Sequence, residues 1–366
     1  MTTMKIDTAK TTSPDQMYEA LKARLADILP DFEIRHKAEL AAEINRLKAE
    51  RGAVILGHNY MEPALYHSVC DFKGDSLELS RLAAEAPGDP IVFCGVRFMA
   101  ETAKILSPEK KVLLPTAKGG CSLAESITGE DVRRLKEKYP GVPVVTYVNT
   151  YADVKAETDV CCTSSNAVKV VESLDSDRVI FLPDEYLAMN VARETGKSII
   201  FPTRDGAKVS GLSGNGASGK DSGELQYDMI GWRGRCEVHE QFTVADIENV
   251  RAQFPDVLVL AHPECSPDVV EASDFSGSTS ALITAVRESD AERYLLLTEC
   301  SMADNIVAET EGKEMVRLCS VRCPHMNEIT LENVRDALLH DRFEVDVPEP
   351  TRTRARASIE RMLEIG

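Results

Sequence analysis

The chain has 366 residues, 43% of them hydrophobic, and a formal net charge of −18. This length suits two or three domains, and the apolar content excludes a chain that stays disordered. Acidic residues outnumber basic ones by 60 to 42, which argues against a nucleic-acid-binding protein, because such proteins need clustered Lys and Arg.

The N-terminal residues contain no apolar run typical of a signal peptide, and no stretch of 18 apolar residues occurs anywhere. We therefore expect a cytoplasmic protein that does not span a membrane. Thiols stay reduced in the cytosol, so the ten cysteines are expected to be packing residues, metal ligands or catalytic groups rather than disulfides.

Short apolar runs of strand length alternate with helical patterns along the chain, which predicts an α/β fold. Most of the runs are continuous rather than alternating, as in parallel strands that helices cover on both faces. Nine runs are predicted as strands: Ala53–Gly57, Ile91–Cys94, Val112–Leu114, Val144–Val148, Val179–Leu182, Ile199–Phe201, Val257–Ala261, Tyr294–Thr298 and Met315–Cys319.

These nine strands sort into three sets of three, in chain order. The first strand of each set ends in a polar motif, and the third strand of each set is followed by a cysteine. The motifs are His58-Asn59-Tyr60, Tyr147-Val148-Asn149 and His262-Pro263-Glu264, and the cysteines are Cys121, Cys236 and Cys323. A span of 28 residues separates Cys121 from Asn149 and likewise Cys236 from Glu264, which supports an internal repeat.

A second feature repeats with the same spacing, an Asp followed five residues later by a hydroxyl side chain. The pairs are Asp71 with Ser76, Asp159 with Ser164, and Asp274 with Thr279. Each hydroxyl precedes a helical pattern, so we predict that it caps a helix whose free N–H groups can bind an anion. An ordinary N-cap without a ligand is the alternative interpretation.

The repeat predicts three similar three-layer αβα domains with short parallel sheets, arranged around a pseudo-threefold axis with the active site at its centre. The alternative is the generic recurrence of strand–helix units in any α/β protein. The predicted divisions are residues 1–35 as a helical, partly flexible extension, 36–127, 128–242 and 243–330 as the three domains, and 331–366 as C-terminal helices or tail. A Gly/Ser-rich stretch at about 205–228 is predicted to be an insertion in the second domain.

Three cysteines at equivalent positions suggest thiolates that converge on one metal centre. Zinc with an open fourth position fits three thiolates. An iron–sulfur cubane fits better, because three protein ligands would leave one iron free to act as a Lewis acid. Buried structural thiols remain the alternative, since free Cys is among the most buried residue types.

The strand-end motifs supply groups that can titrate. His58 and His262 can donate to anions or relay protons. Tyr60, Tyr147 and Glu264 are candidates for general acid–base work. Each of them could instead have a structural role at the end of its strand.

The ordered motifs resemble the quinolinate synthase family from about His36 to about Asn333. The segments that carry the resemblance are Gly57–Tyr60, Gly74–Leu77, Phe98–Ala103, Gly120–Ala124, Tyr147–Asn149, Thr163–Asn166, Pro183-Asp184, Cys236–His239, His262–Glu264, Gly277–Thr279 and Cys323–Met326. The resemblance implies condensation of iminoaspartate with dihydroxyacetone phosphate to quinolinate, with loss of phosphate and water, in de novo NAD biosynthesis.

The resemblance also implies a site. It implies a [4Fe–4S] cluster held by Cys121, Cys236 and Cys323, with the fourth iron open to substrate. The other cysteines, Cys319 among them, have no assigned role. By the same resemblance, His58, Ser76, Asn149, Ser164, His262, Ser278 and Thr279 would bind substrate, and Tyr60, Tyr147 and Glu264 would move protons. Because iminoaspartate is unstable in water, hand-over from L-aspartate oxidase is a further expectation.

Two other functions compete with this one. The first is a different [4Fe–4S] hydro-lyase that uses the same Lewis-acid site on a small hydroxy acid. The second is a non-catalytic metabolite-binding protein with three α/β lobes. Under the second, Tyr60→Phe and Glu264→Gln would leave function unchanged.

Overall fold

The computed structural model describes residues 13–202, 209–213, 227–318 and 321–366, with the backbone alone for 209–213. Most of the predicted insertion at 205–228 and the first 12 residues lie outside these ranges. Within them the chain forms two compact units. The first takes in the chain up to Gly120, Val250–Val259 and Thr279–Val347, and the second Cys121–Asn249, Leu260–Ser278 and Pro348–Gly366.

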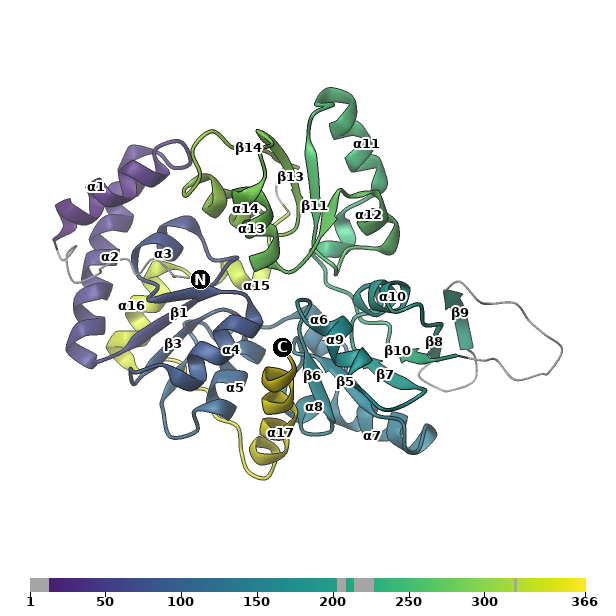
Figure 1. Cartoon of the computed structure of the whole chain (residues 1–366). Helices are drawn as coiled ribbons and strands as arrows, with labels where there is room; N and C mark the ends of the chain where they lie inside the picture. Colours follow the sequence, from purple (N-terminus) through teal and green to yellow (C-terminus); the bar gives the residue numbers. More distant parts are fainter. Residues whose placement is uncertain (1–12, 203–208, 214–226, 319–320) are drawn as a thin grey trace. The chain divides into compact units, whose positions relative to one another are not determined.

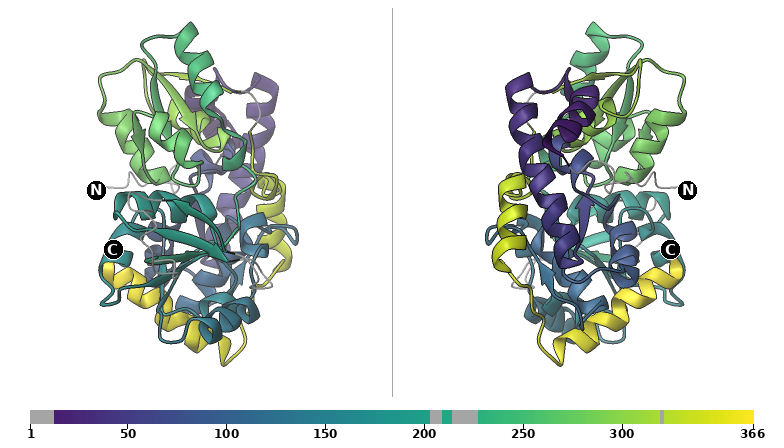
Figure 2. Two further views of the ribbon diagram at one scale, coloured as in Figure 1. Left: turned by 90° about the vertical axis from the view of Figure 1, so that its right-hand side faces the viewer. Right: turned by 90° about the vertical axis from the view of Figure 1, so that its left-hand side faces the viewer.

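The first sheet lies in the first unit and has the strand order β2-β1-β3-β4, all parallel (Figure 1). Helix pairs α4/α5 and α2/α16 pack on it and form helix–sheet–helix layers, and Figure 2 shows α1 beside α2. The elements are α1 (Pro14–Leu25), α2 (Asp31–Arg51), β1 (Val54–His58), α3 (Pro63–Ser68), β2 (Phe72–Gly74), α4 (Ser76–Glu85), β3 (Ile91–Cys94), α5 (Arg97–Leu106), β4 (Val112–Leu113) and α16 (Leu331–His340).

The second sheet lies in the second unit, with the order β6-β5-β7-β10-β8-β9 and only β9 antiparallel to its neighbour. A core of buried apolar side chains fills the space between this sheet and α7, while α9 and α10 cover the sheet on its other side (Figure 1). The elements are α6 (Ser122–Glu125), α7 (Gly129–Lys138), β5 (Val144–Tyr147), α8 (Ala152–Lys155), β6 (Val160–Cys162), α9 (Ala167–Glu172), β7 (Val179–Leu182), α10 (Glu185–Glu194), β8 (Ile199–Pro202), β9 (Val209–Ser213), β10 (Met229–Gly231) and the 3₁₀ turn η2 (His239–Gln241). Helix α17 (Thr351–Ile365) packs on α8 and β6.

The third sheet has the order β12-β11-β13-β14, and the boundary between the two units falls inside β11. Its pairs β11/β12 and β13/β14 are parallel. The elements are α11 (Val244–Gln253), β11 (Leu258–Ala261), α12 (Pro267–Ala272), β12 (Phe275–Ser276), α13 (Thr279–Glu288), β13 (Arg293–Leu297), α14 (Cys300–Val307), β14 (Glu314–Val316) and α15 (Pro324–Asn327).

All nine predicted strands are present, and three short, largely parallel sheets confirm the predicted α/β class. The assignment of strands to the second set was wrong in one place. The strand beside β7, which corresponds to β4 in the first sheet, is β10, and the predicted third strand β8 lies beyond it. Close packing explains the glycine that ends β10, because a Cβ on Gly231 would lie 2.4 Å from the Phe201 ring.

The repeated Asp residues have a structural role in the first two sheets. The Asp71 carboxylate accepts the N–H of Ile55 at 2.8 Å, and the Asp159 carboxylate accepts the N–H of Val144 at 2.7 Å. Each Asp also donates its own N–H to the carbonyl of the same residue, at 2.9 and 3.1 Å. In each of these two sheets the Asp therefore links the first strand of the set to the short strand that follows it. This structural role explains why the Asp is repeated.

Candidate functional site

The predicted site residues divide between the two units. Five belong to the first unit: His58, Tyr60, Ser76, Thr279 and Cys323. Eight belong to the second unit: Cys121, Tyr147, Asn149, Ser164, Cys236, His262, Glu264 and Ser278. Each unit builds its own group of interacting side chains.

The second unit buries one carboxylate, Glu264, which is 3% exposed, just beyond β11. The hydroxyl of Tyr147, at the end of β5, donates to Glu264 Oε1, and the Asn149 amide donates to the same oxygen at 3.3 Å. Nδ1 of His239, which begins η2, lies 2.9 Å from Glu264 Oε2. Three loops from separate places in the sequence thus converge on one carboxylate.

Two histidines stack beside this carboxylate. The His239 and His262 rings lie 4.6 Å apart between centroids, with an interplanar angle of 22°. His262 Nδ1 accepts the N–H of Glu264 at 3.3 Å, so the neutral ring carries its proton on Nε2, which lies 3.4 Å from Ser164 Oγ. This N–H group can donate to an anion.

The first unit repeats this local device at the end of β1. His58 Nδ1 accepts the N–H of Tyr60 at 3.2 Å, which again places the ring proton on Nε2. The Tyr60 hydroxyl lies 2.6 Å from Thr298 Oγ1. Beside them the Asn59 amide donates to Thr279 Oγ1 at 2.9 Å. Tyr60 and Thr279 thus belong to two hydrogen-bonded pairs, Tyr60 with Thr298 and Thr279 with Asn59.

The hydroxyl residues are not the helix caps that the sequence predicted. The N-cap of α4 is Asp75, whose carboxylate accepts the N–H groups of residues 77 and 78, and Ser76 is the first helical residue. The N-cap of α9 is Asn166, two residues after Ser164. Thr279 is itself the first residue of α13. Asp and Asn cap as well as Ser, so adjacent polar residues left the register ambiguous.

The three proposed ligand cysteines are partly exposed residues, whereas most of the other described cysteines are buried. All nine described cysteines are free thiols, and Cys319 lies outside the described residues. The buried ones are Cys70, Cys94, Cys161, Cys162 and Cys265. The partly exposed ones are Cys121, Cys236, Cys300 and Cys323. A thiol must be accessible to bind a cluster, so the predicted ligands fit this chemical requirement.

Each unit contains contacts made by residues next to the proposed ligand cysteines. In the second unit, burial and the nearby charges of Glu264 and Cys121 raise the pKa of Cys236, and the Glu237 N–H lies 3.5 Å from Ser122 Oγ. In the first unit, Nδ1 of His325, two residues after Cys323, lies 3.5 Å from the carbonyl oxygen of residue 118. In the second unit the residue after Cys236 therefore contacts the residue after Cys121.

Cys236 also belongs to a mixed donor group. Its sulfur and one ligand atom each of His239 and Glu264 all lie within 4.8 Å of one another. A thiolate, an imidazole and a carboxylate can be the donors of a zinc site, so this group is a mixed ligand set, distinct from the three cysteines that the sequence predicts as ligands. The two sets share Cys236.

Two buried carboxylates in this region have opposite pKa shifts. Burial alone would raise the pKa of Glu264, but the His239 charge and hydrogen bond, with His262 and Tyr147, outweigh it and lower the pKa. Burial and the negative charge of Glu264 raise the pKa of Asp184, the N-cap of α10, well above its usual value. The two carboxyl groups are therefore shifted in opposite directions, and Glu264 is the one whose ionised form is stabilised.

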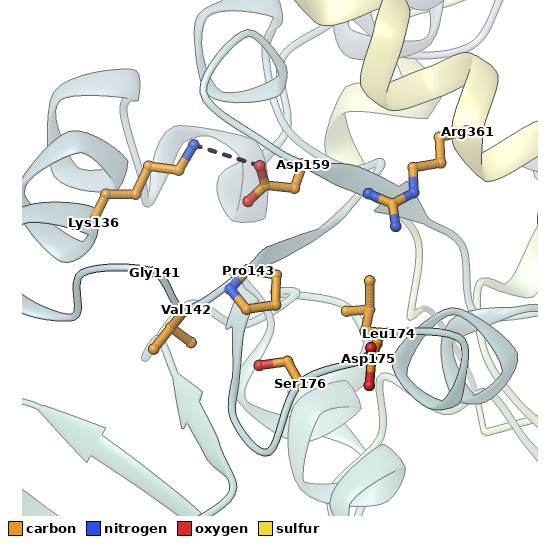
Figure 3. A pocket seen from close by; sticks show the side chains of 9 residues that line it. All are labelled: Lys136, Gly141, Val142, Pro143, Asp159, Leu174, Asp175, Ser176 and Arg361. Carbon is orange, nitrogen blue, oxygen red and sulfur yellow. Dashed lines mark ion pairs between the residues drawn. The ribbon is translucent and has the colours of Figure 1, made fainter.

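A surface pocket of about 530 Å³ lies elsewhere in the second unit (Figure 3). Its lining includes Lys136 and Arg361, with Asp159 and Asp175 among the acidic side chains, and the Lys136–Asp159 ion pair spans 3.9 Å. The side chains that line it include no predicted site residue. The charges of the two signs balance, which does not favour an anionic substrate.

Three residues that form hydrogen bonds with predicted site residues were not themselves predicted. His239 was noted only as the end of a motif, although its spacing of three residues from Cys236 was visible. Asn59 lies inside a predicted motif but was given no role. Thr298 ends a predicted strand beside Tyr60 and carried no sequence signal of its own.

Within the described residues, no helix combines the length and the apolar character that crossing a membrane requires. The fold and the site define an α/β protein with a buried, hydrogen-bonded carboxylate beside the partly exposed residue Cys236.

Comparison with known proteins identifies the family. The family model described as "Quinolinate synthetase A protein" matches residues 42–364, and the chain belongs to this family. It is 51% identical over 349 residues to the quinolinate synthase of Sinorhizobium fredii, covering 95% of this chain and 88% of the relative. It is 50% identical to those of Sinorhizobium medicae, covering 99% and 92%, and Caulobacter vibrioides, covering 91% and 84%. The predicted family and the prediction of an enzyme are confirmed.

Proposed function

We propose that this protein is a quinolinate synthase that condenses iminoaspartate with dihydroxyacetone phosphate, releases phosphate and water, and closes the pyridine ring. The observation that carries the proposal is the buried Glu264 carboxylate, which is bonded to Tyr147, Asn149 and His239 beside the Cys236 thiol. Family membership and the names of the relatives agree with it.

The chemistry needs an ionised base at neutral pH, and Glu264 supplies one because its neighbours lower its pKa. We propose that Glu264 takes a proton from the carbon that becomes the nucleophile. The Tyr147 hydroxyl, already bonded to Glu264, would pass protons to and from oxygen atoms of the intermediates. Tyr60 would do the same in the first unit.

Substrate anions would be held by neutral donors. In the neutral rings of His58 and His262 the proton is on Nε2, because each Nδ1 accepts a backbone N–H, and this Nε2–H group is the donor that we propose for substrate anions. The amide of Asn149 and the hydroxyl groups add further donors. We propose that carboxylates and phosphate are bound by His58, Ser76, Asn149, Ser164, His262, Ser278 and Thr279. Such local donors would be needed because the net charge of −18 repels anions.

We further propose that Cys121, Cys236 and Cys323 hold one [4Fe–4S] cluster. Three partly exposed free thiols on loops suit a cluster with three protein ligands. When bound, such a cluster supplies a Lewis acid that helps to remove a hydroxyl group as water. We also propose that the three αβα domains, ending near residues 127, 242 and 330, close around a pseudo-threefold axis through this centre.

A cytoplasmic location and a functional hand-over of iminoaspartate from L-aspartate oxidase complete the proposal. Purified, anaerobically handled protein is to be assayed for quinolinate from iminoaspartate and dihydroxyacetone phosphate. We expect quinolinate and phosphate in equal amounts. Reconstituted protein that forms no quinolinate, but dehydrates a small hydroxy acid, would overturn the proposal in favour of a hydro-lyase.

A further inference from the structure

The three loops that end in the proposed ligand cysteines are held by the same backbone hydrogen bond. In each repeat the first amide of the helix after the second strand, α5, α10 or α14, donates to the carbonyl two residues before the cysteine. The bonds are Arg97 N–H to Gly119 O at 2.7 Å, Glu185 N–H to Gly234 O at 2.8 Å and Cys300 N–H to Val321 O at 3.0 Å. The first N–H groups of a helix have no partner within the helix, so each loop supplies one.

At the Cys236 loop the side chain of the same helical residue adds an ionic clamp. Glu185 Oε1 lies 2.9 Å from the Arg233 guanidinium, and Oε2 lies 2.9 Å from that of Arg235. The Glu185 side chain is only 8% exposed, while the two arginines are more than 40% exposed. The buried Glu185 carboxylate therefore pairs with both Arg233 and Arg235 of this loop, and Arg235 directly precedes Cys236.

At the Cys323 loop the acidic residue is one position earlier, at the N-cap of α14. The Glu299 carboxylate, 1% exposed, accepts the N–H of Ser301 at 2.7 Å and the backbone N–H of Cys323. In the opposite direction, Arg322 of the loop donates to two side chains of α14, Ser301 Oγ at 2.6 Å and Asp304 at 3.2 Å. The backbone on the N-terminal side of the cysteine is thus fixed through its amide and through its neighbour's side chain.

We propose that Glu185 and Glu299 are positioning residues that hold the Cys236 and Cys323 loops in the geometry a metal centre needs, before that centre is bound. The proposal rests on the proposed cluster for its function. Groups that orient metal ligands typically change metal affinity by about 10- to 100-fold when they are lost. The contacts described run from Glu185 to two arginines of one loop and from Glu299 to the backbone N–H of Cys323, so the carboxylates would act through the loops.

The principal test uses full-length Glu185→Gln, which keeps the side-chain size but places an amide group, with its own N–H donors, against one guanidinium. Glu130→Gln is a matched control, because Glu130 lies in the first turn of α7 and also pairs with two arginines, Arg133 and Arg134, neither of which adjoins a cysteine in the sequence. Alkylation of Cys236 in metal-free protein is followed by peptide mapping, with buried Cys265 as the internal reference.

We expect Glu185→Gln to raise the alkylation rate of Cys236 by about 10-fold and the rate of iron loss to a chelator by about 10- to 100-fold, with Glu130→Gln unchanged. Glu299→Gln should do the same for Cys323. Equal rates in wild-type protein and both variants would overturn the proposal. Wild-type protein that takes up no iron and sulfide would refute the proposed cluster. The alkylation rates would still show whether Glu185 and Glu299 hold the two cysteine loops in place.

Discussion

Glu264→Gln tests the proposed chemistry, because it removes one negative charge and almost no volume. The Gln carbonyl can still accept from Tyr147 and Asn149, but its NH₂ group then faces His239 Nδ1, which now lies 2.9 Å from a carboxylate oxygen. The His239 ring can accept from this NH₂ group with its proton on Nε2, but the hydrogen bonds to a charged carboxylate become weaker bonds to a neutral amide, which costs about 1.5–3 kcal/mol of unfolding free energy. Loss of the base should lower kcat by about 10²–10⁴-fold.

Asp184→Asn is the matched control in the same region. Burial and the nearby Glu264 charge raise the pKa of Asp184, which favours its neutral carboxyl group, and Asn has the shape of that neutral form. Its Oδ1 can still accept the N–H of Leu187, which caps α10 at 2.7 Å. We therefore expect kcat within about threefold of wild type.

The two variants are compared by steady-state quinolinate formation at pH 7.5 and by urea unfolding. We expect a large loss of activity for Glu264→Gln and almost none for Asp184→Asn. Equal losses in the two variants, or near wild-type turnover in Glu264→Gln, would refute the assignment of Glu264 as the ionised base.

Three further predictions concern other parts of the chain. Burial, with the charges of Lys73 and Arg24, lowers the pKa of His67 to about 2. In the unfolded chain the same side chain takes up a proton near pH 6.5. Because only the unfolded state then binds this proton, about 2 kcal/mol of unfolding free energy should be lost as the pH falls from about 7.5 to about 5.0. Urea unfolding of His67→Gln should show that much less pH dependence, and parallel profiles would contradict the prediction. Ile180→Ala empties a fully buried position in the core of the second sheet and should cost about 2–5 kcal/mol in the same assay, with a loss under 1 kcal/mol as the contrary result. Tyr60→Phe should lower kcat about 100-fold while KM stays near wild type, and unchanged kcat would exclude a proton-transfer role.

Strands were predictable where they are buried on both faces, because a continuous apolar run is then required. Val54–His58 and Val179–Leu182 are such strands, with every residue buried. Four of the five missed strands are two or three residues long, and the fifth, β9, has five residues and falls in the predicted insertion. Phe72–Gly74 contains a Lys and is partly exposed, so no apolar run marks it. Met229–Gly231 was too short to be separated from its polar surroundings, which led to the wrong third strand in the second set.

The candidate site was predictable where residues follow strands and repeat. Tyr147 and Glu264 were chosen on that basis, and they form a direct hydrogen bond. His239 lies on a 3₁₀ turn, and only tertiary folding brings its ring to Glu264. The positioning role of Glu185 was likewise hidden, because its partners are 48 and 50 residues away in sequence.

The central claim is that three thiols, one from each repeat, hold the iron–sulfur centre of a quinolinate synthase. Iron and acid-labile sulfide are to be quantified after anaerobic reconstitution of wild-type protein, of the alanine variants of Cys121, Cys236 and Cys323, and of Cys265→Ala as a buried control. The proposal predicts about four iron and four sulfide per chain in wild type and in Cys265→Ala, and a loss of at least half in each of the other three. Full iron and sulfide content in any of those three variants, or a colourless wild-type protein that binds zinc, would contradict it.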